Sequence, residues 1–276
     1  MKNIDKKVAD DFGAEWEKYD QSALDENQLK IAWNQYFKIF PFNKLVSNAE
    51  GFDMGCGSGR WAKFVAPLVG KLNCIDPSVR ALNVAKKNLF EFENISFINA
   101  SVSDDMLPFE SQDFGYCLGV LHHIPDTKKG IESCAKALKK GAPFLLYLYY
   151  NFENRSFVFK FIWKITDFIR KIISSLPSKL KMLVCYLIAL FIYYPLARIS
   201  LIFTKLKINP KFMPLSDYKD KKFYFMKTDA LDRFGTRLEK RFSRQEITEM
   251  LENAGFENIN FSNEMPYWVC ISSKKF

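Results

Sequence analysis

The stretch Gly51–Phe64, "GFDMGCGSGRWAKF", decides the fold of this 276-residue chain. A short apolar segment carries an acid, Asp53, and leads into a turn in which Gly55, Gly57 and Gly59 alternate with other residues. A glycine-rich turn between a strand and a helix lets backbone N–H groups approach a ligand closely. The stretch therefore predicts a strand–turn–helix unit with a ligand site at the turn, although a purely structural tight turn would look similar.

Short strands and helices alternate on both sides of this turn. The pattern predicts strands at 51–55, 71–76, 95–100, 114–121 and 143–150, with helices at 60–69, 79–90 and 127–140. A helix at 243–255 and two strands at 258–263 and 267–275 follow after a break. We expect an α/β, Rossmann-like, doubly wound sheet of seven strands whose last strand pair is antiparallel, interrupted by a helical insertion.

The change of pattern along the chain divides it into four parts. Residues 1–48 form an N-terminal helical lid, with a helix within 22–48 that Pro41 ends. Residues 49–150 form the ligand-binding core, and 229–276 complete it. Residues 151–228 carry no strand alternation and form the insertion.

The composition is that of a globular protein, with 48% hydrophobic and 26% charged residues. The polar start of the chain shows no signal peptide. Six cysteines are scattered without CxxC spacing, and the chain has two histidines. We therefore expect reduced thiols, a cytoplasmic location and no metal site, with membrane association through the insertion as an alternative.

The net charge of +9 is concentrated in one region. Residues 151–245 contain 20 Lys or Arg and 7 Asp or Glu. A basic region suggests nucleic acid first, but this region is also very apolar, which fits a membrane surface at least as well.

A second acid, Asp76, ends the second expected strand, 23 residues after Asp53. A carboxylate at that place binds the ribose of a nucleotide ligand in a doubly wound sheet. The third glycine comes one residue too early for a dinucleotide fingerprint. The spacing instead suits a ligand that has a ribose and an amino-acid tail.

Four segments together resemble the class I S-adenosylmethionine-dependent methyltransferases, closest to the type 11-like subgroup with a "GVLHHIPDT" segment. They are "FDMGCGSGRWA", "CIDPSVRALNVAKKNL", the run from Met106 to Tyr150, and "FSRQEITEMLENAGF". The chain departs from the family pattern at Phe114–Gly115 and at Lys140–Pro143. We expect these departures to alter local packing and to leave cofactor binding intact.

The resemblance implies S-adenosyl-L-methionine as cofactor and gives each cofactor-binding residue a role. The glycines would approach the methionine moiety, Asp76 would bind both ribose hydroxyls, and Asp53 would bind ordered water or the methionine amine. Further expected contacts are Ser101 and Val102 near the adenine, Leu118 and Gly119 under the sulfonium, and Trp16 and Tyr19 as a lid. The two aromatic residues could also simply dock on the domain.

Methyl transfer requires an aligned acceptor and removal of its proton. His122 and His123, just after the fourth expected strand, are the candidate bases, although they could instead order the loop through hydrogen bonds. Adjacent side chains are expected to diverge, so that one of them faces the acceptor. Tyr147, Tyr149, Tyr150 and Asp229 are weaker candidates for the acceptor pocket.

The insertion contains two apolar helical segments. In 156–173, a narrow polar stripe carries Lys160, Lys164, Asp167 and Lys171. In 182–197, 16 uncharged residues are interrupted by Pro195, fewer than the roughly 20 that span a bilayer. The insertion is a lid over the acceptor, a dimer contact, an element of a membrane interface or, least favoured, a spanning hairpin.

The leading hypothesis is an enzyme that methylates an O or N atom of a hydrophobic or membrane-linked small molecule. Alternatives are methylation of a soluble sugar or secondary metabolite and, from another class, a nucleic-acid-binding or modifying protein. The aromatic-rich insertion makes a nucleic-acid partner the weaker reading. The sequence does not indicate an oligomeric state.

Overall fold

The protein is described by a computed structural model that covers residues 3–20, 26–210 and 213–276. Its contacts divide the chain into two compact units. Unit 1 comprises Met1–Glu153 and Leu238–Phe276, and unit 2 comprises Asn154–Arg237. Unit 2 thus corresponds to the expected insertion, but it extends nine residues beyond 228 because a helix runs across that position.

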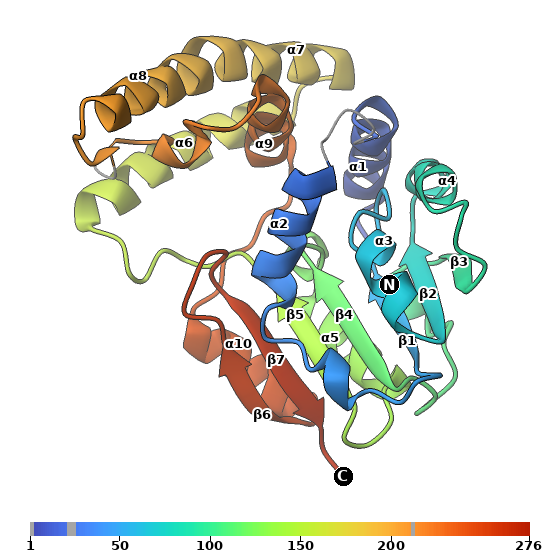
Figure 1. Cartoon of the computed structure of the whole chain (residues 1–276). Helices are drawn as coiled ribbons and strands as arrows, with labels where there is room; N and C mark the ends of the chain where they lie inside the picture. The colour runs from blue at the N-terminus through green and yellow to red at the C-terminus, as the bar shows by residue number, and fades with distance from the viewer. Residues whose placement is uncertain (1–2, 21–25, 211–212) are drawn as a thin grey trace. The chain divides into compact units, whose positions relative to one another are not determined.

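Unit 1 contains a seven-stranded sheet with the order β3-β2-β1-β4-β5-β7-β6 (Figure 1). The first five strands are parallel, β7 is antiparallel to β5, and β6 is antiparallel to β7. The expected doubly wound sheet with an antiparallel final pair is confirmed. The strands are β1 (Glu50–Met54), β2 (Lys71–Asp76), β3 (Ile95–Asn99), β4 (Phe114–Leu118), β5 (Pro143–Tyr147), β6 (Phe256–Phe261) and β7 (Val269–Lys274).

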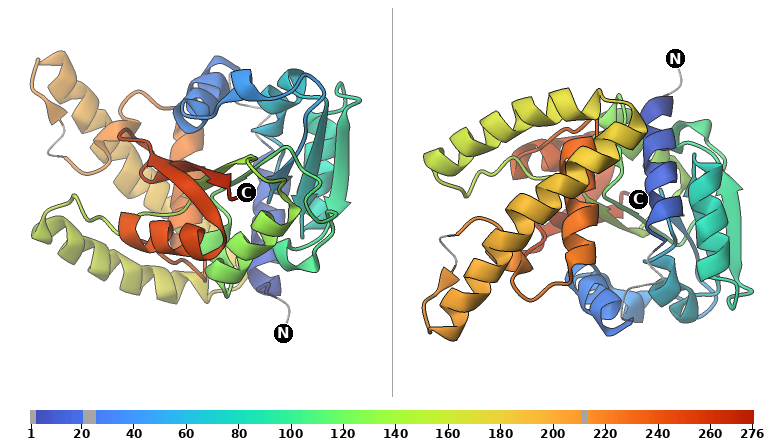
Figure 2. Two further views of the ribbon diagram at one scale, coloured as in Figure 1. Left: turned by 90° about the horizontal axis from the view of Figure 1, so that it is seen from below. Right: turned by 90° about the horizontal axis from the view of Figure 1, so that it is seen from above.

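Helices cover both faces of the sheet (Figure 2). One face packs on α5 (Thr127–Ala137) and α10 (Arg244–Asn253), and the other packs on α2 (Glu26–Phe37), α3 (Ala62–Val65) and α4 (Val79–Asn88). Successive strand residues supply the two cores, because strand side chains alternate between faces. In β2, for example, Leu72 and Cys74 lie in one core and Ile75 in the other.

Side chains at the helix starts show why these segments are helical. Ser78 and Asp126 cap α4 and α5 by accepting bonds from the N–H groups of Ala81 and Lys129. Ser243 and Glu246 form a reciprocal capping box at the start of α10. The helix expected there is confirmed, and Gly255 ends it with φ +82°.

The N-terminal region differs from the expectation in its helix boundaries. Within 22–48, α2 ends at Phe37, four residues before Pro41, and a single 3-10 turn follows at Phe42–Lys44. Residues 21–25 lie outside the described part of the chain. A separate helix, α1 (Lys6–Lys18), precedes them, with Asp5 as its N-cap.

The departure from the family pattern at Gly115 has a packing reason. A Cβ atom added to Gly115 would lie 2.3 Å from Cζ of Phe52, and one added to Gly51 would lie 2.3 Å from Cε1 of Phe114. The two phenyl rings of β1 and β4 therefore occupy the space that side chains at these positions would need. That this packing differs from the packing of the family stays a prediction.

Unit 2 is entirely helical in its described residues. It contains α6 (Phe157–Ser174), α7 (Ser178–Ile188), α8 (Tyr194–Lys205), the 3-10 turn η7 (Ser216–Tyr218) and α9 (Phe223–Gly235). The helices α6 and α7 pack against α9. The expectation that Pro195 interrupts the second helix is wrong: a π-helical turn, η5 (Ala189–Tyr193), accommodates the proline, and one continuous helix runs over Ser178–Lys205.

Candidate functional site

The expected cofactor-binding residues gather at one edge of the sheet. Gly55 directly follows β1, Asp76 ends β2, Ser101 lies two residues after β3, and Gly119 follows β4. These are the carboxyl ends of parallel strands, and the strand order reverses between β1 and β4. Ligands of doubly wound sheets bind in the crevice at such a point.

The glycine turn is held against the end of β2. The N–H groups of Gly55 and Cys56 donate to the carbonyl of Ile75 at 2.7 and 3.0 Å. Gly55, Gly57 and Gly59 have φ angles of +79°, +56° and +77°, a region that side chains rarely adopt. A Cβ at Gly55 would also lie 2.4 Å from Cγ2 of Val120, so both the backbone conformation and the lack of space require glycine here.

Asp76 connects the turn to the second strand. Its Oδ2 accepts a bond from Gly57 N at 3.0 Å, and its Oδ1 accepts one from Ser78 N at 2.8 Å. Burial raises the pKa of this carboxyl to about 6, and the two backbone N–H groups oppose that shift. A carboxylate oxygen has a second lone pair, so both oxygens can still accept from a pair of hydroxyls while the backbone fixes their direction.

Asp53 is buried in β1 and is chemically unsatisfied. Its Oδ2 has no hydrogen-bond partner within the described residues. Burial raises its pKa to about 8, the nearby Tyr116 hydroxyl opposes this shift, and the charge of Asp76 adds to it. Asp53 is therefore largely protonated at neutral pH in this structure, and a cationic or hydrogen-bonding group nearby would stabilise its ionised form.

A cavity of about 340 Å³ opens beside the third strand end. Ser101 and Val102 line it, together with Met106 and Phe109 of the following loop. Ser101 starts a 3-10 turn in which its N–H donates to Asp104 Oδ2 at 2.8 Å. The sequence indicated Ser101 and Val102 here, but it did not indicate the loop residues Met106 and Phe109. Their apolar side chains within the turn-rich run "SDDMLPFESQ" could have suggested a binding loop.

The fourth strand end leaves open space. Leu118 is the last residue of β4 and is buried, and Gly119 has φ +81°. No described atom lies within 4 Å of a Cβ added at Gly119. Glycine here serves the backbone conformation and leaves room beside the strand end.

Trp16 and Tyr19 lie at the end of α1. A Cβ added to Gly57 would lie 2.9 Å from Nε1 of Trp16, so the indole covers the glycine turn. The guanidinium of Arg60 lies 5.5 Å from the Trp16 ring centroid and 4.4 Å from that of Trp61. Tyr19 is buried, and its N–H bonds to the Glu15 carbonyl. The indole of Trp16 is docked on the glycine turn in this structure, and its role as a lid over the donor stays a prediction.

The two histidines occupy the 3-10 turn Leu121–His123 that follows β4, and both are buried. Their ring centroids lie 4.0 Å apart. The expectation that adjacent side chains diverge is wrong here, because a 3-10 turn separates consecutive side chains by about 120° rather than the 180° of a strand.

His122 is a neutral imidazole in an apolar setting. Neither ring nitrogen has a hydrogen-bond partner within the described chain. Burial, followed by the charges of His123 and Arg241, holds its pKa well below the usual range. The Nδ1 of His123 lies 2.7 Å from the carbonyl oxygen of Leu238, which can only accept, so Nδ1 carries the proton in that contact.

An aromatic cluster adjoins the histidines. The Tyr149 ring stacks on His122 at a centroid distance of 3.8 Å, and Tyr147 contacts Tyr36 of α2 at 5.2 Å. Arg241 lies 5.0 Å from the Tyr149 ring centroid. The sequence indicated the two β5-end tyrosines, but it did not indicate Tyr36 or Arg241, whose separation in the chain gives no local pattern.

Two of the weaker acceptor candidates lie elsewhere. Tyr150 packs edge-on against Phe152 and Tyr267. Asp229 is half-buried within unit 2, where it interacts with Tyr193 and Tyr218, and desolvation raises its pKa. The described contacts therefore give Asp229 no part in the cluster of unit 1.

The residues of the crevice fit S-adenosylmethionine. The carboxylate of Asp76 is preoriented by two backbone N–H groups, open space adjoins Gly119, and the cavity beside Ser101 can take an aromatic base. Asp53 supplies an unsatisfied buried oxygen for a polar group. A nucleoside with a cationic amino-acid tail satisfies this combination of groups.

Comparison with known proteins leads to the same class. Residues 52–146 match the family model described as "Methyltransferase domain". A ubiquinone biosynthesis O-methyltransferase of Aromatoleum aromaticum is 27% identical over 133 residues, which are 48% of this chain and 53% of the relative. One of Erwinia tasmaniensis is 28% identical, over 42% of this chain and 46% of the relative. The chain thus spans about half the length of the curated relatives it matches.

Solved structures agree on the fold. A structure named as a methyltransferase of Bacillus halodurans has a TM-score of 0.51 and 16% identity, over 82% of this chain and 70% of that chain. A phosphoethanolamine N-methyltransferase of Haemonchus contortus, bound to S-adenosylhomocysteine, has a TM-score of 0.50 and 15% identity, over 87% and 39%. Residues 52–146 of this chain thus match a methyltransferase domain, and the solved structures have the same fold.

Proposed function

We propose that the protein transfers a methyl group from S-adenosylmethionine to an oxygen or nitrogen atom of a hydrophobic small molecule, with oxygen preferred. The observation that carries the proposal is the geometry of Asp76. Its two oxygens are held by the N–H groups of Gly57 and Ser78 at the point where the strand order reverses. Such a carboxylate binds the two hydroxyls of a ribose.

When bound, S-adenosylmethionine supplies a methyl group on a positively charged sulfur. The chain's own residues then have to align the acceptor and exclude water. We assign the backbone of the glycine turn to the amino-acid tail and the cavity at Ser101 and Val102 to the base. Leu118 and Gly119 would border the reacting centre, and Trp16 with Tyr19 would close over the donor.

One imidazole of the His122–His123 pair would remove the acceptor's proton. A histidine that is neutral near pH 7 can act as a base, and burial keeps His122 neutral. The contact of His123 Nδ1 with the Leu238 carbonyl holds the proton on Nδ1, which makes Nε2 the basic nitrogen of that ring.

The base can be identified by replacing each histidine separately with asparagine. Removal of the group that takes the proton is expected to lower kcat by about 10²- to 10⁴-fold and to leave donor affinity unchanged. The other replacement is expected to have a much smaller effect. Equal losses of donor affinity in both variants would instead indicate that the pair only orders the loop.

The names of the relatives favour oxygen on a hydrophobic ring as the target, since they are ubiquinone biosynthesis O-methyltransferases. The aromatic cluster of Tyr36, Tyr147 and Tyr149 would suit a flat apolar acceptor. Such an acceptor partitions into membranes, which fits a cytoplasmic enzyme that works at a membrane surface.

Calorimetric titration of the full chain with S-adenosylmethionine, S-adenosylhomocysteine and NAD tests the donor. We expect binding of the first two and none of the third. Incubation with donor labelled in its methyl group and a panel of hydroxylated quinone precursors, phenols, amines and sugars tests the acceptor by mass spectrometry. Binding of NAD alone would contradict the donor assignment. Labelling of sugars but not of apolar phenols would contradict the acceptor assignment.

A further inference from the structure

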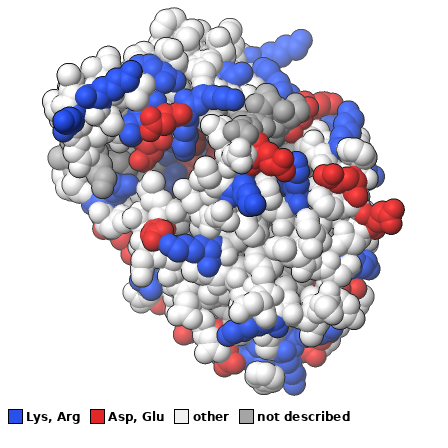
Figure 3. Space-filling view, in the orientation of Figure 1, with Lys and Arg blue, Asp and Glu red and all other residues white. Residues whose placement is uncertain are grey.

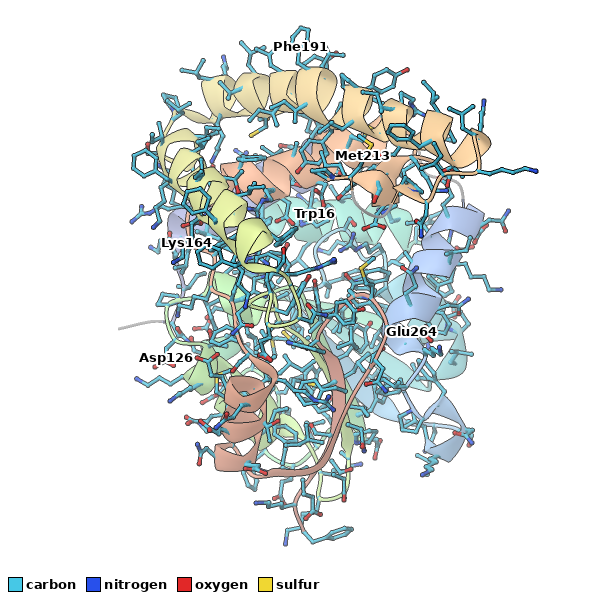
Figure 4. The ribbon with its side chains drawn as sticks, turned by 90° about the vertical axis from the view of Figure 1, so that its left-hand side faces the viewer. Trp16, Asp126, Lys164, Phe191, Met213 and Glu264 are labelled. Carbon is cyan, nitrogen blue, oxygen red and sulfur yellow. The ribbon has the colours of Figure 1, made fainter. Side chains whose placement is uncertain are left out.

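The helices of unit 2 place several polar side chains inward and many large apolar side chains outward. On α6, Arg170 is 4% exposed while Phe168 is 65% exposed. On α7 and α8, Lys181 and Ser200 are buried while Phe191 is 69% exposed, and Figure 4 shows its ring pointing away from the rest of unit 2. Soluble proteins place charged groups outside and large apolar groups inside, so unit 2 is not built for water alone.

The inward polar groups are satisfied within unit 2. Arg170 donates to Asp167 Oδ1 at 2.8 Å and to the Thr236 carbonyl at 2.7 Å. Arg233 of α9 donates to Thr166 Oγ1 at 2.8 Å. These ion pairs and hydrogen bonds lie beside an apolar interior that includes Ile173, Met226 and Leu231, so the unit has a core without the apolar side chains outside.

The exposed apolar surface is concentrated in this unit. Of the 28 large apolar side chains that are exposed in the described chain, 19 lie within Asn154–Arg237. A single soluble chain rarely leaves so much contiguous apolar surface in water. This surface therefore has an occupant in the working protein.

The arrangement of charges on α6 indicates what the occupant is. At 100° per residue, Phe161, Ile165, Phe168 and Ile172 lie within about 60° of one another on the outward side. The lysines form a second stripe along one border of this apolar face: Lys160, Lys164 and Lys171. Lysines beside an outward apolar face place ammonium groups at the level of lipid phosphates while the face enters the acyl region.

The helix of α7 and α8 presents an uncharged outer side over its whole length. Between Lys179 and Lys205 it contains two charged residues. Lys181 is buried, and Arg198 donates to the carbonyls of Lys219 and Lys221. This 28-residue helix is long and apolar enough to cross a membrane, with a mean hydropathy of 1.9, and only 22% of its apolar window is buried.

Two observations favour a helix that lies in the interface over one that spans. Its uncharged run has 16 residues, fewer than the roughly 20 needed to cross the hydrocarbon core. Its buried side carries Lys181 near one end and Ser200 near the other and packs within unit 2, so only the other side can contact lipid. A one-sided apolar surface is typical of helices in the membrane plane.

The positive charge of unit 2 indicates a membrane that contains anionic lipids. Unit 2 contains 17 lysines and arginines and five aspartates, and Figure 3 shows Lys and Arg side chains over its helices next to uncharged surface. We propose that α6 and the α7–α8 helix insert their outward apolar faces into the interface of an anionic lipid bilayer and lie in its plane. This partner is independent of the methyl donor, so it can be tested without activity.

Flotation of the purified full chain with vesicles tests the proposal. We expect the protein to float with vesicles of phosphatidylcholine and phosphatidylglycerol at 7:3, and at least ten times less with phosphatidylcholine alone. Raising the salt concentration is expected to weaken binding, because lysine–lipid attraction is screened. Washing at pH 11 is expected to release the protein.

Matched variants distinguish binding through the apolar faces of unit 2 from non-specific hydrophobic binding elsewhere on the protein. The double variant Phe168→Ser/Phe191→Ser is expected to lose at least tenfold in vesicle affinity. The control Phe90→Ser removes a phenyl ring that is 84% exposed on unit 1 and is expected to change nothing. Lys160→Gln/Lys164→Gln is expected to lose about tenfold or more on anionic vesicles, and its control Lys128→Gln/Lys140→Gln much less.

Three results would overturn the proposal. The protein could remain unbound with anionic vesicles, or Phe90→Ser could reduce binding as much as the unit 2 variant. It could resist release at pH 11, which would indicate a spanning helix. Finally, light scattering could show a dimer that Phe168→Ser/Phe191→Ser converts to a monomer without any change in flotation, which would make a second copy the occupant. Donor titration of each variant shows that unit 1 remains folded.

Discussion

At the scale of single residues, the carboxylate of Asp76 has a structural role and a proposed role in donor binding. It holds the glycine turn through Gly57 N and the start of α4 through Ser78 N, while each oxygen keeps a further lone pair. Burial raises its pKa to about 6, so the carboxylate form predominates at neutral pH. Structure and proposed binding therefore depend on the same charge.

Replacing Asp76 by alanine is expected to weaken S-adenosylmethionine binding by about 30-fold or more, since two hydrogen bonds to a charged acceptor are lost. Asp76→Asn keeps one acceptor oxygen and is expected to lose less. Calorimetric titration measures both, with circular dichroism as a check of folding. A folded Asp76→Ala protein with undiminished donor affinity would refute the ribose assignment.

Asp53 gives a pH-dependent prediction. Its pKa is about 8 in the native protein against 3.8 ordinarily, so between these values the native state holds a proton that the unfolded chain has released. Its contribution to stability is therefore complete below pH 4 and is lost as the pH rises through 8. We expect Asp53→Asn to reduce the fall in the free energy of unfolding between pH 5 and 8 by about 3 kcal/mol.

Urea unfolding of the ligand-free wild type and Asp53→Asn at the same pH values measures this difference. His122 acts in the opposite direction, because its lowered pKa costs stability at acid pH, but it contributes equally to both proteins. Parallel pH profiles for the two proteins would show that Asp53 is ionised in the native state.

The site residues show what sequence can and cannot predict at this scale. The glycine spacing and the acid at 76 predicted that these residues gather at one edge of the sheet, because the ends of parallel strands must meet there, and the structure brings them together. The contact between the His122 and His123 rings depended on a 3-10 turn that no spacing revealed. Arg241 reaches Tyr149 from a segment 92 positions later, which a single sequence cannot indicate.

At the scale of elements, α6 shows the limit of a helical wheel. The wheel revealed two unlike sides, but periodicity alone does not tell which side faces the protein. The structure turns Asp167 and Arg170 inward. Pro195 shows a second limit: proline predicts an interruption, whereas the π-helical turn before it kept the helix continuous.

The inward pair on α6 predicts a stability effect. Asp167→Ala leaves the buried Arg170 guanidinium without its carboxylate, and we expect a loss of about 2–4 kcal/mol. Phe168→Ser, the neighbouring outward position, is expected to change the free energy of unfolding by less than about 0.5 kcal/mol. Urea unfolding followed by hydrogen exchange of α6 measures both. The reverse order of effects would mean that α6 faces its partner helices with the opposite side.

At the scale of the whole molecule, the proposed donor binding and the proposed membrane contact belong to different units of the chain. Unit 1 carries every residue assigned to the donor. Unit 2 carries an excess of basic over acidic residues, 17 against five, and 19 of the 28 exposed large apolar side chains of the described chain. The alternation of strands and helices predicted this division, because residues 151–228 break it. The end of the insertion was harder to predict, since α9 continues across position 228 without any change in composition.

Because donor binding and membrane contact are assigned to different units, we expect the donor and the vesicles to protect different segments from hydrogen exchange. A ligand that binds only the native site stabilises it by about 2.7 kcal/mol at a concentration of 100 Kd. Saturating S-adenosylmethionine is therefore expected to slow exchange in the glycine turn, α1 and the end of β4 by up to about 100-fold, and to leave α6–α9 unchanged. Anionic vesicles are expected to slow exchange in α6 and α7–α8 and to leave the sheet unchanged. If the donor also slowed exchange throughout α6–α9, the two units would be energetically coupled, and donor binding would be expected to alter vesicle affinity by the same factor.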